Sequence, residues 1–259
     1  MAGSVYFQAF KTSLQTKLEY RADFFLGVTA SLGLQAAGLG TLWVVLNQIP
    51  SLAGWSGMQV AMLFGLTTAV QGLSELLFNH IWYVPTYVIR GQIDRLMVYP
   101  VKSLPFFLLT SPELHAFGNM CGGILIYSVA AHHLGQPWWG YALLPYWIIC
   151  GCLVHSSALV VCGAMCFIVK GQRGQQYWVI NALLQATRYP LSVFPNPMQI
   201  VLLFIIPFGA VSFLPVGWTL GKSGAFAALG LPALAAGIST WVAFKAWDYG
   251  LDKYESTGS

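Results

Sequence analysis

The feature that most constrains this chain is the length of its stretches without Asp, Glu, Lys or Arg. Four such stretches run from Phe24 to Ser74, from Leu114 to Val169, from Tyr189 to Gly221 and from Ser223 to Phe244. Charged residues make up only 8% of the chain, and its mean hydropathy is +0.66. A soluble domain of this size carries charge on roughly a quarter of its residues, so we expect lipid to be the main solvent of this protein.

The same stretches predict how often the chain crosses the membrane. A transmembrane helix needs about 20 apolar residues, so the first two stretches each hold two crossings and the last two hold one each. Turn-forming clusters, "NQIPSLAGWSG" and "LGQPWWGY", divide the two long stretches. We therefore predict an all-α, polytopic membrane protein with six transmembrane helices in a single domain, residues 24 to 259. The expected spans are Phe24 to Leu46, Met58 to Tyr83, Leu114 to His133, Tyr141 to Val169, Met198 to Leu214 and Ser223 to Phe244.

The positions of the basic residues predict the orientation. If the N-terminus is cytoplasmic, Lys222 is the one Lys or Arg on the outer side, and the other eleven of the 12 fall on the inner side. Those eleven are Lys11, Lys17, Arg21, Arg90, Arg95, Lys102, Lys170, Arg173, Arg188, Lys245 and Lys253. We therefore expect both termini to be cytoplasmic.

Residues 1 to 23 have the pattern of an amphipathic helix. Apolar side chains recur at steps of three and four residues, whereas basic and amide side chains occupy much of the remaining surface. The apolar set is Phe7, Phe10, Leu14 and Leu18. Such a helix lies in the inner headgroup layer with its basic face toward anionic lipid, either as a simple anchor or as a mechanical element.

The second expected span carries a polar stripe. Thr68, Gln71, Glu75 and Asn79 follow one another at steps of three, four and four residues, which places them on one side of a helix. Apart from histidines, Glu75 is the only acid or base inside any expected span. A carboxylate facing hydrocarbon costs several kcal/mol, so we expect the stripe to face other helices, water or a passing substrate. Hydrogen bonding between helices, or a Glu75 close enough to the inner surface to reach water, remains an equal alternative.

The fifth expected span is rich in proline. Pro190, Pro195 and Pro197 precede it, and Pro207 lies inside it, where a missing backbone hydrogen bond should kink the helix. The following segment, 215 to 224, is expected to be an outer loop that dips partly into the membrane.

Signatures of catalysis are absent from the sequence. No HExxH motif and no pair of membrane aspartates occurs, and "GKSG" from Gly221 lacks the first glycine of a phosphate-binding loop. Cys162 and Cys166 lie one helical turn apart, but four convergent ligands for zinc are not apparent. We expect no catalytic residue, no metal, no cofactor in this chain and no nucleic-acid partner.

Four local patterns, together with the six spans and the basic N-terminal helix, carry a family resemblance. They are "IRGQIDRLMVYPV", "RYPLSVFP", "FIIPFGAVSFLP" and "WDYGLDKYESTG". The chain resembles the permease of an ABC-2 type ABC transporter, and within that group a bacterial subfamily of six-span permeases. The resemblance implies a multi-pass protein of the bacterial inner membrane and a separate ATPase subunit that binds ATP and Mg.

The same resemblance implies a coupling helix at about residues 85 to 104, inserted into a groove of the ATPase. Ile93 and Leu96, with Ile89 and Met97, would form its apolar side. Arg90, Asp94 and Arg95 would supply charges that pair across the interface. Inside-positive anchoring explains the arginines but not Asp94. A cytoplasmic loop is expected at about 170 to 195.

The resemblance further implies a translocation path between two permease halves, identical or unlike, lined by the second and fifth spans. The candidate path residues are Thr68, Gln71, Glu75, Asn79 and Pro207. Relatives export drugs, lipid-linked compounds and polysaccharides, so the implied activity is efflux, with multidrug efflux as one form. An aromatic path with one acid suits an amphipathic or cationic compound. An ion-coupled secondary transporter and a non-transporting membrane scaffold are the alternatives.

Overall fold

A computed structural model describes residues 8, 11–13, 15, 21–48, 51–99, 101–169 and 174–254. Most of the expected N-terminal amphipathic helix lies outside these residues. The described chain is helical, with one isolated bridge between Leu52 and Trp55. Its long helices are α2 (Arg21–Gln48), α3 (Gly57–Phe78), α7 (Ala116–His133), α9 (Leu144–Ile168), α10 (Gln175–Ala186) and α14 (Ala225–Asp252).

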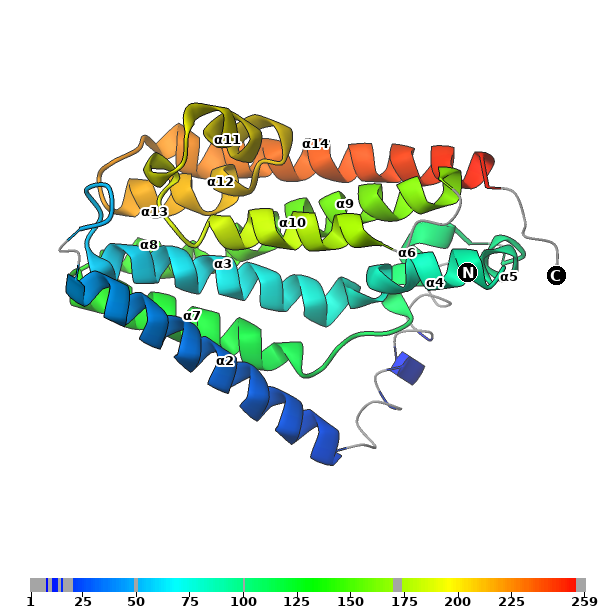
Figure 1. Cartoon of the computed structure of the whole chain (residues 1–259), viewed down its shortest axis with the longest axis horizontal. Helices are drawn as coiled ribbons and strands as arrows, with labels where there is room; N and C mark the ends of the chain where they lie inside the picture. Colours follow the sequence, from blue (N-terminus) through cyan, green and yellow to red (C-terminus); the bar gives the residue numbers. More distant parts are fainter. Residues whose placement is uncertain are drawn as a thin grey trace.

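The long helices form a bundle that extends along the long axis of the molecule (Figure 1). The core of the bundle is α9, which contacts α3, α10, α12 and α14 and whose residues are mostly buried. By contrast, α2 packs chiefly on α7 and leaves most of its surface exposed. The outward faces of α2 and α14 carry large apolar side chains, as expected for surfaces in contact with hydrocarbon.

Short helices join the long ones. At one end of the bundle α3 continues through η1 (Asn79–Tyr83) into α4 (Val84–Ile89), α5 (Ile93–Met97) and α6 (Ser103–Leu109). At the opposite end α8 (Trp138–Ala142) precedes α9 (Figure 1). Between α10 and α14 lie η2 (Leu191–Val193), α11 (Asn196–Ile200), η3 (Val201–Ile205), α12 (Phe208–Val211) and α13 (Phe213–Thr219).

In the described part, four helices are long and apolar enough to cross a membrane. They are Ala22–Thr41 within α2, Gly57–Ile89, Trp138–Ile168 and Ala225–Asp252. A bent pair, Asn196–Ile205 with Phe208–Thr219, makes a fifth if it counts as one span. The all-helical membrane fold is therefore confirmed, whereas the structure supports four or five crossings by length and composition.

The third predicted span appears as α7, which begins and ends within two residues of the prediction but is less apolar than the four long helices. It packs closely on α3 because glycines line the contact. A Cβ atom on Gly72 would overlap the backbone nitrogen of Met120, and one on Gly65 would lie 2.8 Å from the carbonyl oxygen of Gly123. Small residues let two helix backbones approach closely in a membrane, so the pair α3 and α7 is a tight unit.

The fifth region differs most from the prediction. The expected cytoplasmic loop, 170 to 195, contains α10, which lies along the bundle beside α9 with Tyr177, Ile180 and Leu184 buried (Figure 1). A search for long apolar stretches did not detect α10, because four amide side chains lower its apolarity. They are Gln175, Gln176, Asn181 and Gln185. The expected helix from Met198 to Leu214 is broken, since its two parts meet at 71°.

Lys222 joins two segments at the end of the bundle opposite α4, α5 and α6. Its Nζ atom donates to Gly54 O at 3.2 Å and to Gln59 Oε1 at 2.9 Å, and lies 4.1 Å from the centroid of the Trp55 ring. These contacts join the loop before α14 to the loop before α3, and we call them the clasp. Partial burial lowers the pKa of the Lys222 ammonium from its ordinary value, because desolvation disfavours the charged form.

Candidate functional site

The expected coupling segment is not one helix but three, α4, α5 and α6, which we call the foot. The break after α4 lies at Gly91, whose φ of +66° is in the left-handed region that glycine adopts without strain. The backbone N–H of Gln92 donates to Tyr87 O at 2.9 Å and closes the turn. The segment therefore folds back on itself, and residues that would line one side of a continuous helix separate.

The apolar residues of the foot divide into an anchor and an exposed tip. Ile93 is fully buried and Leu96 is half-buried, so these two attach α5 to the rest of the chain. Met97 is 54% exposed and Val98 is 83% exposed, and Ile89 is also exposed. Of the predicted apolar side, Ile93 and Leu96 thus hold the foot in place, whereas Ile89 and Met97 are exposed.

The charged residues of the foot belong to the same short segment as this tip. Arg90 and Arg95 are exposed, and Asp94 is half-buried. A cluster of exposed apolar side chains flanked by guanidinium groups has the chemistry of a protein interface, where apolar contact gives affinity and charge gives orientation. The structure thus places the five predicted coupling residues, Arg90, Ile93, Asp94, Arg95 and Leu96, in one compact element.

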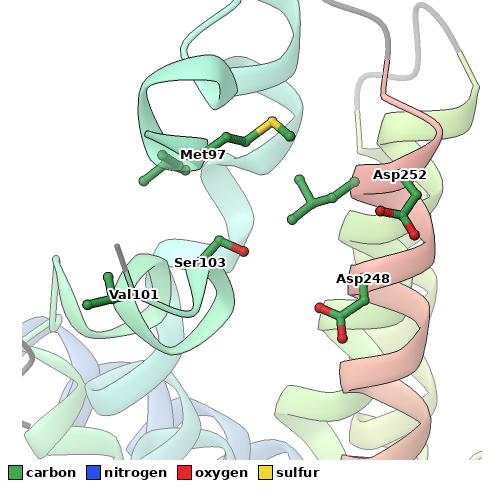
Figure 2. Close-up of a pocket in the computed structure, with 7 residues that line it drawn as sticks. Met97, Val101, Ser103, Asp248 and Asp252 are labelled. Carbon is green, nitrogen blue, oxygen red and sulfur yellow. The ribbon is translucent and has the colours of Figure 1, made fainter. Parts of the chain in front are cut away.

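A groove of about 300 Å³ separates the foot from the end of α14. Figure 2 shows Met97 and Ser103 on the foot side and Asp248 and Asp252 on the α14 side, all directed into the groove. The two walls are joined below the groove by a hydrogen bond from Trp247 Nε1 to Ser103 Oγ at 3.0 Å. The sequence analysis missed Asp248 and Asp252, although their four-residue spacing at the end of the last apolar stretch was a readable signal.

The polar stripe of the second span forms part of a larger network. Glu75 Oε1 accepts a hydrogen bond from Gln71 Nε2 at 2.8 Å, and Glu75 Oε2 accepts one from Asn119 Nδ2 on α7 at 3.1 Å. Asn119 Oδ1 in turn accepts from Gln35 Nε2 on α2 at 2.9 Å. The carboxylate of Glu75 therefore faces other helices, as one of the alternatives predicted.

The network also contains a base. Arg188, which follows α10, donates from Nη2 to Gln71 Oε1 at 3.2 Å, and its guanidinium carbon lies 4.7 Å from the centroid of the Phe64 ring on α3. We call Gln35, Gln71, Glu75, Asn119 and Arg188 the belt, because they link α2, α7, α3 and the turn after α10. The sequence analysis assigned Arg188 to the inner side, and the structure places it against the middle of α3.

The remaining predicted path residues lie apart from the belt. Thr68 is fully buried, and its hydroxyl has no hydrogen-bond partner in the described part of the chain. Asn79 lies beyond α3, at the start of η1. Pro207 stands between η3 and α12, where the chain bends by 71°, so the predicted break at this proline is confirmed. One continuous stripe from Thr68 to Asn79 is therefore not formed.

Sequence reasoning missed three members of the belt for one reason. Gln35 and Asn119 are neutral, and Arg188 stands at the boundary of a charge-free stretch, so a search for charges inside spans found Glu75 alone. Isolated amides within apolar stretches were the available signal, because a buried amide needs a partner.

Comparison with known proteins gives one match. A protein-family model described as ABC-2 family transporter protein matches residues 32–258, which include the belt, the foot and α14. Neither the curated proteins nor the solved structures gave a match to the chain.

Proposed function

Because this chain belongs to the ABC-2 transporter family, we propose that it is the permease half of an ATP-driven exporter, docked through its foot to the ATPase subunit. Family membership makes it a membrane permease of an ABC transporter and implies an ATPase partner. The outward direction, the docking at the foot and the cargo are our proposals. The family match favours this class over an ion-coupled secondary transporter or a membrane scaffold.

The observation that carries the docking proposal is the exposed tip of the foot. Met97 and Val98 are apolar and exposed at one end of the bundle, and the exposed Arg90 and Arg95 belong to the same short segment. A soluble partner that covers this tip would remove apolar area from water and pair with the arginines. The groove beside α14 extends the same surface and adds two carboxylates, so the docking surface is larger than a single coupling helix (Figure 2).

We further propose six crossings with the foot and both termini in the cytoplasm. The crossings are α2, α3, α7, α8 with α9, a broken fifth from α10 to α13, and α14. At 1.5 Å per residue, the 18 residues of α7 span about 27 Å, close to the thickness of the hydrocarbon core. With Arg188 in the belt, ten of the eleven bases assigned to the inner side remain there, which keeps the orientation.

The chain is a permease without a catalytic site of its own in this proposal, and the ATPase binds ATP and Mg. Binding of ATP closes the ATPase pair, and the foot transmits that movement to the bundle only if its contacts with the ATPase differ between the two states. The broken fifth crossing, with Pro207 at its bend, is the element best suited to change shape. An amphipathic compound is the cargo class that we propose.

A second permease, identical or unlike, completes the path in this proposal. The exposed apolar faces of α2 and α14 offer surface both for that partner and for lipid. Mass measurement of the intact complex distinguishes a homodimer from a heterodimer, and a chain that remains single in the active complex contradicts the pairing.

The docking proposal is tested by the double variant Asp94→Ala/Arg95→Ala. The complex purified in lipid nanodiscs should hydrolyse ATP but lose most of its ATP-dependent transport, because the foot no longer follows the ATPase. The control is Lys245→Ala, which removes an exposed base from α14 that does not line the groove beside the foot. A double variant with full transport, or a chain that purifies with no ATPase, refutes the docking proposal.

A further inference from the structure

The transport path predicted from the sequence does not include the positive charge of Arg188. The path was expected to hold one acid, Glu75, and therefore to favour a cation. In the structure Arg188 is half-buried, and Glu75 acts on it electrostatically. A charge that is removed from water without compensation is costly, so the two charges have to be considered together.

The hydrogen bonds of the belt all point toward Glu75. Arg188 donates to the oxygen of Gln71, and the nitrogen of Gln71 donates to Glu75. On the other side Gln35 donates to the oxygen of Asn119, and the nitrogen of Asn119 donates to Glu75. Each amide thus directs its N–H group, the positive end of its dipole, toward the carboxylate of Glu75.

A second contact fixes the Arg188 side of this arrangement. Thr187, the neighbour of Arg188, is fully buried, and its carbonyl oxygen accepts a hydrogen bond from Thr67 Oγ1 on α3 at 3.3 Å. The turn after α10 is therefore attached to α3 by its backbone at Thr187 and by its side chain at Arg188. Four segments, α2, α7, α3 and this turn, meet through the belt.

We propose that Arg188 is the half-buried counter-charge of Glu75, bridged by Gln71, and that the pair positions the turn after α10 on α3 instead of binding cargo. This inference deepens the proposed function, because it removes the basis for cation selection at Glu75. Glu75 and Arg188 together carry no net charge, so the pair does not select an amphipathic cargo by its charge. The moving part of the bundle then lies beyond the pair, from η2 to α13.

The test compares Glu75→Gln, Arg188→Gln and the double variant Glu75→Gln/Arg188→Gln in the full-length chain. Thermal unfolding in detergent is followed by tryptophan fluorescence, which needs neither the ATPase nor a cargo. Each single neutralisation leaves one unpaired, half-buried charge and should lower the unfolding temperature by roughly 6–15 °C. The double variant should be more stable than the worse single variant, since no unpaired charge remains. Lys245→Gln on α14 and Asp23→Asn on α2, both at exposed positions, are matched controls that should change it little.

Additive losses in the double variant overturn the inference, and so does a Glu75→Gln protein as stable as the original. If the single variants do not fold, expression of the full-length chain fused to a fluorescent protein replaces unfolding. Recovery of expression in the double variant then supports the pair, and continued failure contradicts it.

Export by the complex supplies a separate readout. If Glu75→Gln selectively abolishes export of cations and the double variant does not restore it, Glu75 binds cargo. If the original chain purifies without an ATPase, the proposed function is refuted, but the unfolding measurements still test the pairing of Glu75 with Arg188.

Discussion

The foot and the belt use charged side chains in opposite ways. Arg90 and Arg95 of the foot project outward beside exposed apolar groups, whereas Glu75 and Arg188 of the belt are joined through Gln71 inside the bundle. An exposed charge contributes little to folding stability because water solvates it equally well in the unfolded chain. A buried charge depends on its partners. We therefore expect the belt to determine stability and the foot to determine coupling, and the variants below follow in order of their expected effect on unfolding.

The largest effect is expected at Gly72, where the belt depends on the close approach of α3 and α7. A Cβ atom there would overlap the backbone of Met120, which cannot rotate away, and would lie 2.8 Å from the carbonyl carbon of Asn119. Gly72→Ala should therefore cost about 3 kcal/mol, the upper part of the range for overpacking, and lengthen the bond from Asn119 to Glu75. Thermal unfolding measures the loss.

The matched control for Gly72 is Gly33→Ala on α2. A Cβ atom at Gly33 would meet nothing within 4 Å, so this substitution should stabilise the chain slightly through helix propensity. Equal unfolding temperatures for the two variants would contradict the tight packing of α3 on α7.

Asn119→Leu should have the second-largest effect. It removes a donor to Glu75 and an acceptor for Gln35, so it separates α2 from the belt. Loss of these two bonds should cost about 1–3 kcal/mol, because buried polar groups are left without partners. Cys121→Ala, at an exposed position of the same helix, is the control. If both variants unfold alike, Asn119 has no role in the belt.

Lys222→Gln tests the clasp and should have a smaller effect. The variant loses the contact of the ammonium with the Trp55 ring, worth about 0.5–1 kcal/mol at an exposed site. Lys222→Arg retains the positive charge and should unfold near the temperature of the original chain. Identical values for Gln and Arg would show that the charge does not stabilise this end of the bundle.

Val98→Asp at the foot should have the smallest effect on unfolding, within about 0.5 kcal/mol, because Val98 is 83% exposed. The same change places a carboxylate in the proposed docking surface and should prevent co-purification of the ATPase. Val98→Ile keeps the apolar surface and should retain the partner. A destabilised Val98→Asp protein, or one that keeps its ATPase, would contradict the expectation that the foot determines coupling and the belt determines stability.

The accuracy of the sequence analysis varied along the chain for a physical reason. Spans such as α7 and α9 begin and end close to their predicted limits because long apolar runs allow few alternatives in lipid. The segment from 85 to 104 was expected to be one helix, but Gly91 divides it, and periodicity alone does not reveal a left-handed turn. The helix α10 was missed because its amides reduce its apolarity, although Gln176 and the buried Asn181 find backbone acceptors in the folded chain.

The sequence by itself determined that this chain is a helical membrane protein and which stretches are apolar enough to meet lipid. These properties depend on the transfer of each segment from water to hydrocarbon, which is a sum over local residues. Only the tertiary structure decided that Arg188 belongs beside Glu75 and that Gln35 and Asn119 join them. Partners that lie 44 to 117 residues apart in the chain are brought together by packing, and no local pattern records which buried polar groups meet.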